Sequence, residues 1–242
     1  MSSTFRKILV CLIAVFAVSA VMASTASAKR VWFVNGVQLA SGTSNGAAIK
    51  VVKSGTTKLK SKEEFVCTEQ VLSHNPKIWN KEKAAGEVVG RDEGITEFKK
   101  CKNLTNAGCT VTEPIITENT SSEASTLVEK EKGKTPIYDM FVGKGWEESA
   151  PTAKKPFAKI VQTGAGCITA ITVEGNGVAA EIEPETSSVK KTFKFPCPPI
   201  SPVWLWDGVE DKLSLKAFGT VKAEFCGSIE VELVSGKTWA VK

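Results

Sequence analysis

The sequence predicts a mainly β protein, an antiparallel sandwich- or barrel-like domain built from hairpins and preceded by a signal-peptide helix. Asn-Gly and Asp-Gly dipeptides stand between strand-like runs, where they favour the two-residue turns of β-hairpins. The C-terminal third alternates apolar and polar residues, as a half-buried strand does. Few long stretches have the 3.6-residue periodicity of a helix.

Residues 1–28 are typical of a cleavable secretory signal. Arg6 and Lys7 precede an apolar run from Ile8 to Met22, and a small-residue cleavage site follows at Ala26-Ser27-Ala28. The run is short of the roughly 20 residues that span a bilayer, which argues against the alternative of an uncleaved anchor. We therefore expect a secreted, extracellular mature chain, residues 29–242, with no membrane span after cleavage.

The strands are expected in order along the mature chain. Three hairpins are predicted: 31–34 with 37–39 across Asn35-Gly36, 168–173 with 178–182 across Asn176-Gly177, and 203–206 with a stretch ending at residue 215 across Asp207-Gly208. The alternating residues 229–233 predict a further strand, and a turn at Ser235-Gly236 leads into a last one. Residues 121–132, with a hydroxyl-rich start, are the best helix candidate.

Two polar stretches, 73–86 and 142–157, are predicted as loops or insertions. The second, rich in Gly and Pro, could divide the domain into two lobes, the alternative to one unit. A loose echo also links the two halves: Cys67 and Cys101 are 34 residues apart, and Cys167 and Cys197 are 30 apart. A duplication and a chance similarity between hairpins both account for that echo.

The cysteine count predicts disulfides. Of seven cysteines, Cys11 is removed with the signal, and an even number in an exported chain favours bonded pairs. Six cysteines allow 15 connectivities, among which the sequence does not choose. The disulfide candidates are Cys67, Cys101, Cys109, Cys167, Cys197 and Cys226.

The net charge of the chain excludes few classes of function. Loss of Arg6 and Lys7 leaves 29 basic against 26 acidic residues, a net charge of +3. The lysines are scattered among glutamates, without the basic stripe that nucleic-acid binders carry. We therefore expect no nucleic-acid partner.

No motif for catalysis, metal or cofactor stands out, so we assign no such residue. The single histidine, His74, is expected in an exposed loop, and no G-x-S-x-G motif marks a nucleophilic serine for a triad. Glycosidases need only two close carboxylates, which a charged surface readily offers. The candidate glutamates are Glu174, Glu181, Glu183, Glu230 and Glu232, and we favour the solvent face of half-buried strands for them.

Trp204 and Trp206 are the most suggestive aromatic residues. Two positions apart on a strand, they share a face and could stack on sugar rings. The alternative is that the tryptophans fill the core of a β domain that has few other aromatic residues.

Two sequons, Asn103-Leu104-Thr105 and Asn119-Thr120-Ser121, matter only in a host that glycosylates asparagine. The Ala- and Val-rich signal looks bacterial.

The chain resembles a group of uncharacterised secreted proteins that occur as paralogues in actinobacteria. The resemblance is carried by the Ala-Ser-Ala cleavage site, Trp32-Phe-Val-Asn-Gly36, Phe65-Val-Cys67, and Phe98-Lys-Lys-Cys101 followed by Cys109-Thr-Val-Thr112. It covers about half of the chain and implies a secreted, mainly β protein without an activity to carry over.

These observations predict a non-enzymatic extracellular or surface-associated binding protein. Its expected partners are cell-wall or other extracellular polysaccharide, or protein. The alternatives are a secreted, carboxylate-dependent hydrolase such as a glycosidase, and a structural or inhibitor-like domain.

Overall fold

The computed structural model describes residues 30–83, 86, 88–118, 120–126, 137–142, 155–175, 177–182, 186–196, 203–206, 209–212 and 214–242. These residues form strands and one short 3-10 helix. The predicted signal helix lies outside them. No helix among them is long and apolar enough to cross a membrane.

The elements follow the chain in this order: β1 Trp32–Val34, β2 Val37–Gln38, η1 Thr43–Asn45, β3 Ala47–Ser54, β4 Thr57–Lys60, β5 Glu64–Glu82, β6 Val88–Asn103, β7 Thr110–Val111, β8 Ile115–Thr117, β9 Thr120–Thr126, β10 Ile137–Val142, β11 Lys155–Thr163, β12 Ala170–Gly175, β13 Val178–Ile182, β14 Lys190–Phe195, β15 Val203–Trp206, β16 Val209–Lys212, β17 Leu215–Ala217, β18 Val221–Leu233 and β19 Trp239–Val241. The expected mainly β, antiparallel, sandwich- or barrel-like fold is confirmed.

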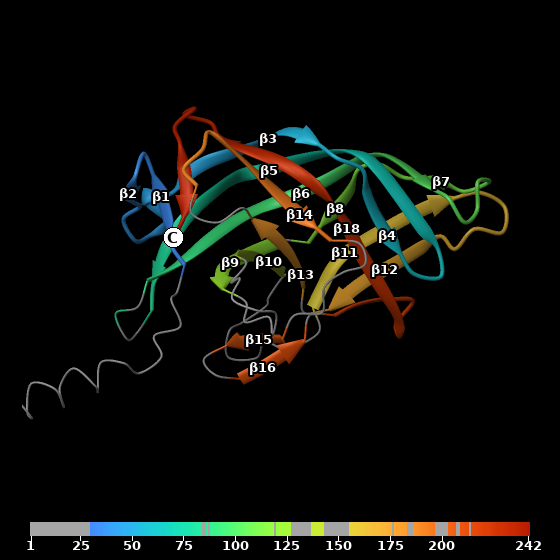
Figure 1. The fold of residues 1–242 in the computed structure, drawn as a ribbon. Helices are drawn as coiled ribbons and strands as arrows, with labels where there is room; N and C mark the ends of the chain where they lie inside the picture. The colour runs from blue at the N-terminus through green and yellow to red at the C-terminus, as the bar shows by residue number, and fades with distance from the viewer. Residues whose placement is uncertain are drawn as a thin grey trace, which may run out of the picture.

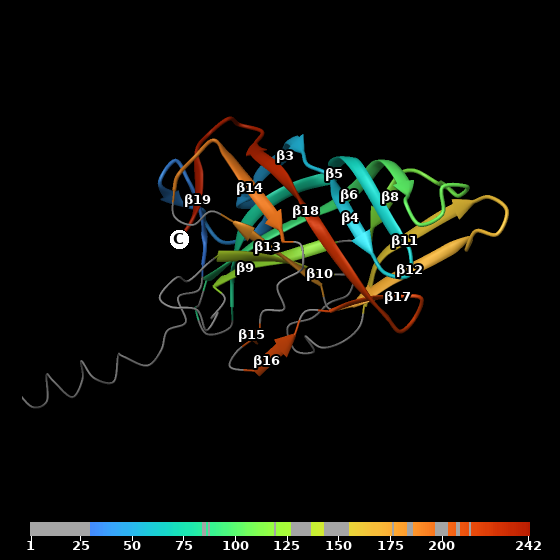
Figure 2. The same ribbon diagram turned by 45° about the vertical axis from the view of Figure 1, so that its right-hand side comes forward.

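The main sheet closes on itself twice, and both closed rings use β5, β6 and β18. Ring A runs β14-β13-β10-β9-β6-β5-β3-β18 and back to β14. Ring B runs β6-β8-β11-β12-β17-β18-β4-β5 and back to β6. Figure 1 shows the three shared strands running from one ring to the other, and Figure 2 shows the same arrangement from a second side.

Each shared strand gives one half of its length to each ring. In β18, Val221–Cys226 pairs with ring B strands, while Gly227–Leu233 pairs with ring A strands. In β5 the change of ring coincides with a bulge, because the register with β6 shifts between Ser73 and Lys77. Gly94 of β6 faces this bulge, and a Cβ there would lie 3.0 Å from Cβ of Pro76. Bulges re-aim side chains and bend a strand, as a strand that serves two rings requires.

One hydrophobic core fills both rings. Buried and partly buried aromatic rings form a chain in which each ring centroid lies 5.0–6.3 Å from the next. The chain starts in ring B and ends at the far side of ring A, in the order Phe157, Phe225, Phe195, Phe141, Phe193, Trp239 and Trp32. The two rings are therefore continuous in their packing.

A small sheet of β2, β1 and β19 lies at the outer end of ring A, where it joins the two ends of the described chain (Figure 1). Trp32 of β1 and Trp239 of β19 are both fully buried, with ring centroids 5.5 Å apart. The amide of Asn80 in β5 binds β1 like a strand neighbour: Oδ1 accepts from Trp32 N at 2.9 Å, and Nδ2 donates to Trp32 O at 3.1 Å. These contacts fasten the small sheet to ring A.

Two hairpin predictions are confirmed. Asn35 and Gly36 have φ of 50° and 77° between β1 and β2, as the predicted turn requires. β15 pairs with β16 around the predicted Asp207-Gly208 turn, whose two residues lie outside those described.

The hairpin predicted across Asn176-Gly177 is wrong. β12 pairs with β11 and β17 in ring B, whereas β13 pairs with β10 and β14 in ring A. Gly177, at φ 136°, is needed for close approach instead, because a Cβ there would lie 2.4 Å from the carbonyl oxygen of Phe141. The connection between these strands crosses from one ring to the other.

The helix predicted at 121–132 is also wrong as far as the chain is described. Residues 120–126 form β9, which pairs with β6 and β10. Strand partners on both sides override the local helical signal, which hydroxyl-rich residues carry only weakly.

The loop predicted at 73–86 is mostly strand, because β5 continues through it to Glu82 after the bulge. The other predicted loop lies largely outside the described residues.

We expect the two buried tryptophans to be strongly coupled contributors to stability. Trp32→Ala and Trp239→Ala should each lower the free energy of unfolding by about 3–5 kcal/mol, since each leaves a large cavity. Because the rings touch, the double variant should lose less than the sum of the two single losses. Urea unfolding followed by circular dichroism measures both effects. Val37→Ala, at a residue 69% exposed, is the matched control, and a Trp239→Ala loss as small as the control's would contradict the role of this sheet.

Peptide mapping of the non-reduced protein should return three disulfide-linked pairs. Cys67–Cys101 and Cys109–Cys167 are formed in the structure, and Cys226 is disulfide-bonded as well. Cys197 lies outside the described residues and is the one cysteine of the predicted mature chain left to pair with Cys226. A free thiol at Cys226, or its linkage to Cys11, would refute this connectivity.

Candidate functional site

Three loops meet at the outer end of ring B and form a cross-linked surface (Figure 1). They connect β4 to β5, β6 to β7, and β11 to β12. We call this surface the stapled tip and define it as residues 61–63, 103–109 and 162–169. Loops held on a rigid scaffold are where binding residues concentrate.

A disulfide joins two of these loops. Cys109 is the last residue of the β6–β7 loop and Cys167 lies in the β11–β12 loop, with Cα atoms 5.8 Å apart. Gly164, at φ 136°, allows the loops to approach, since a Cβ there would lie 2.6 Å from the carbonyl oxygen of Gly108. Within the loops, Cys109 N donates to Asn106 O at 3.0 Å. The cross-link therefore fixes two already compact turns against each other.

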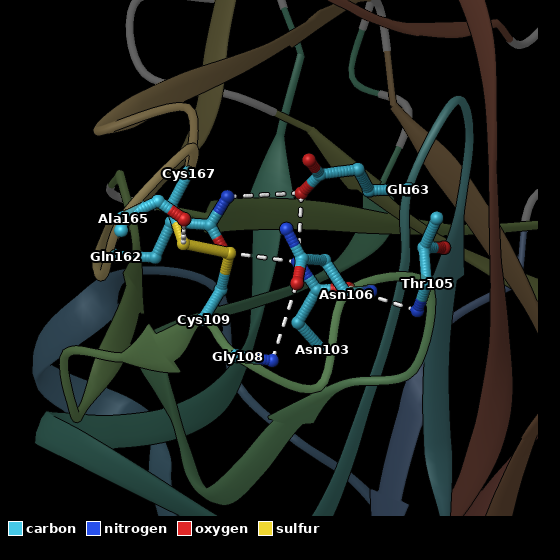
Figure 3. The surroundings of a disulfide bond; sticks show 9 residues. All are labelled: Glu63, Asn103, Thr105, Asn106, Gly108, Cys109, Gln162, Ala165 and Cys167. Carbon is cyan, nitrogen blue, oxygen red and sulfur yellow. Dashed lines mark hydrogen bonds between the residues drawn. A yellow bond between two sulfur atoms is a disulfide. The ribbon is translucent and has the colours of Figure 1, made fainter.

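A polar triangle, in which two of the three side chains are buried, lies beside the disulfide (Figure 3). Oε2 of Glu63 accepts hydrogen bonds from Nδ2 of Asn103 at 2.8 Å and from Nε2 of Gln162 at 2.9 Å. Nδ2 of Asn103 also donates to Oε1 of Gln162, at 2.9 Å. Gln162 is fully buried and Asn103 is 4% exposed. The triangle links all three loops, and buried polar groups satisfied in this way make one arrangement much more stable than others.

The amide oxygen of Asn103 shapes the loop that follows this residue. Oδ1 accepts from Thr105 N at 2.9 Å and from Asn106 N at 3.0 Å, an Asx-type turn. Leu104, inside this turn, donates its N–H to Glu64 O at 2.8 Å. The backbone around Leu104 is thus held from both sides.

The tip exposes apolar side chains above this rigid base. Leu104 is 55% exposed, and Ile168, next to the disulfide, is 44% exposed. Sequence reasoning missed Leu104. The available signal was an apolar residue between Asn103 and Thr105, two residues that favour turns, close to a cysteine.

The structure places the remaining sequence-predicted residues elsewhere. Trp204 and Trp206 lie in β15, opposite Asp211 and Val209 of β16, but their side chains are not among those described, so stacking stays a prediction.

Cys67 and Cys101 are bonded as cross-strand neighbours in β5 and β6. Because Cys167 bonds to Cys109, the disulfides do not follow the predicted echo between the two halves.

His74 is exposed, as expected, but lies in the bulge of β5, where it adopts φ 63°. Its Nδ1 lies 3.1 Å from Oγ of Ser73. Hydrogen bonding from that same serine, followed by Lys99, lowers the pKa of Glu97 below its usual value. The serine here lies next to Nδ1 of the imidazole, the nitrogen that the carboxylate occupies in a hydrolytic triad.

The described glutamates considered for hydrolysis lie opposite lysines on neighbouring strands. Glu230 pairs with Lys190 at 3.2 Å, and Glu232 pairs with Lys50 at 3.0 Å. Glu181 and Glu174 lie opposite Lys194 and Lys216 in the strand register. Glu183 lies outside the described residues. The expected solvent face of charged strand residues is thus confirmed for Glu230 and Glu232.

Two small cavities lie inside the rings. The ring B cavity has a volume of about 30 Å³ and apolar walls that include Phe65, Phe98 and Phe157. The ring A cavity has about 20 Å³ and includes Asp92 in its wall. Both are far below the roughly 150 Å³ of an engineered cavity that binds benzene. Among the described side chains, no group of three His, Cys, Asp or Glu residues is placed to hold a metal ion.

Comparison of the chain with protein-family models, with curated proteins and with solved structures finds no match. The candidate site is therefore defined by the geometry of this chain alone.

Removal of one member of the polar triangle should loosen the stapled tip. Gln162→Leu leaves Glu63 and Asn103 each with one hydrogen bond fewer, which should lower the free energy of unfolding by about 1–3 kcal/mol. Denaturant unfolding with the disulfides intact measures this loss. Thr163→Ala, at the exposed neighbouring position, should change stability little, and equal stabilities of the two variants would show that the triangle does not support the tip.

Proposed function

We propose that the protein is a secreted, non-enzymatic binding protein that uses the stapled tip to hold a protein partner. One observation carries the proposal: Leu104 is exposed on a loop that a disulfide and a buried hydrogen-bonded triangle hold in place. An exposed apolar side chain costs solubility, and apolar groups that stay exposed together often mark interaction sites. Fixing such a group before binding removes the entropy cost of ordering it in the complex.

Export is supported by two independent features. The first 28 residues have the three parts of a secretory signal, and the described cysteines form disulfides, which persist in oxidising compartments. An inhibitor-like domain is a special case of this proposal, in which the partner is a protease. A purely structural role differs from this proposal in that it predicts no partner at the tip.

A second candidate function is polysaccharide binding by the β15–β16 hairpin. This two-stranded sheet is separate from the main sheet in its hydrogen bonding, and both views show it to one side of the rings (Figures 1 and 2). It carries Trp204 and Trp206, which are two positions apart in a strand and therefore share a face. Aromatic side chains with a polar group suit surfaces that are partly wet and partly apolar. The carboxylate-dependent hydrolase has no comparable support, since Glu230 and Glu232 are each paired with a lysine.

Site-specific photocrosslinking tests the tip. A crosslinker at position 104 should capture one defined protein from the cell envelope or culture fluid of the producing cells, whereas the same group at position 37, exposed at the opposite end, should not. With the captured protein purified, Leu104→Asp and Ile168→Asp should weaken binding at least about tenfold, about 1.4 kcal/mol, without lowering thermal stability. Val37→Asp is the matched control.

The two candidate functions give opposite results. If insoluble polysaccharide retains the protein, and Trp204→Ala with Trp206→Ala abolishes retention while Leu104→Asp does not, the hairpin is the binding element and the tip is not. If the tip variants bind the captured protein as tightly as Val37→Asp does, the tip proposal is refuted.

A further inference from the structure

We infer that a folded molecule of this chain cannot carry an N-linked glycan at Asn103, although Asn103-Leu104-Thr105 is a complete acceptor sequence. Folding and modification at this asparagine are mutually exclusive. The inference concerns the maturation route of the protein and does not depend on what the stapled tip binds.

The chemistry of the modification conflicts with the contacts of Asn103. Glycan transfer forms a bond between Nδ2 and the anomeric carbon of the sugar, breaks the bond from that carbon to the phosphate of a lipid-linked donor, and removes one amide proton. Nδ2 already donates both of its protons, one to Glu63 and one to Gln162. A glycosylated nitrogen keeps one proton, so the hydrogen bond to Glu63 or the one to Gln162 would be lost.

Space is the second obstacle. Asn103 is 4% exposed, and Gln162, which its Nδ2 contacts, is fully buried. A sugar ring on Nδ2 would have to occupy the position of the Glu63 and Gln162 side chains, beside the Cys109–Cys167 disulfide (Figure 3). Rotation of the amide toward solvent would also remove the two hydrogen bonds from Oδ1 that form the turn around Leu104.

The contacts of Asn103 restrict the cells in which this chain can fold. A transferase that modifies asparagine before folding would trap the chain in an unfolded state. The buried Asn103 side chain is therefore compatible with an export route that lacks this transferase, or with one in which folding precedes transfer.

Production in a secretory host that glycosylates asparagine tests the inference. The chain is used with Asn119→Gln, so that any N-linked glycan lies on Asn103. Intact mass, thermal melting and mobility without reducing agent are measured on the secreted and the retained fractions. We expect the secreted, folded protein to be unmodified at Asn103, and any modified chain to be confined to the retained fraction.

A rescue variant separates glycosylation from other causes of poor yield. Thr105→Ala removes the sequon at the cost of one hydrogen bond, from Glu64 N to Thr105 Oγ1. If modified chains are retained, Thr105→Ala or an inhibitor of glycan transfer should raise the secreted yield several-fold. The same variant in a non-glycosylating host controls for the lost bond. Secreted protein that carries a glycan on Asn103 and melts at the temperature of the unmodified protein would overturn the inference.

Discussion

The fold depends on three strands that each belong to two closed rings. β5 and β6 stay paired over nearly their whole length, and β18 closes both rings on the other side. In β5, the register against β6 shifts where the two rings meet. The bulge at residues 74–76, opposite Gly94, is that shift. The unusual backbone of His74 thus follows from architecture and needs no catalytic explanation.

The interior and the ends of the rings are stabilised by different means. Apolar packing is continuous through the middle, where aromatic rings contact one another from ring B to ring A. The ends instead use polar side chains that take the place of missing backbone partners: Asn80 binds β1 at one end, and Asn103 shapes the loop at the other. Both ends expose apolar side chains, Val37 at one and Leu104 at the other, but among the described residues only at the tip does a disulfide join the loops that carry them. That rigidity is the reason to propose the tip as a recognition surface.

Local signals in the sequence predicted the class of the fold and several of its parts. Alternation identified the strand at 229–233, Asn35-Gly36 identified a true turn, and the even cysteine count identified a disulfide-linked chain. The wrongly predicted hairpin has its cause in pairing between residues distant in sequence. Asn176-Gly177 has the local chemistry of a hairpin turn, yet its flanking strands find partners in different rings. The polar triangle was equally hidden, since Glu63, Asn103 and Gln162 come from three separate segments.

The pairing of β1 with β19 makes the order of synthesis matter. The first strand of the described chain has its neighbour at the last, so the outer end of ring A cannot close while the C-terminus is still being made or transported. Contacts between such distant residues also form slowly, because a long loop must close before they contribute stability. A chain with this topology completes the outer end of ring A only late in folding. That delay agrees with the export that we propose, because an exported polypeptide passes through a narrow channel before it becomes compact.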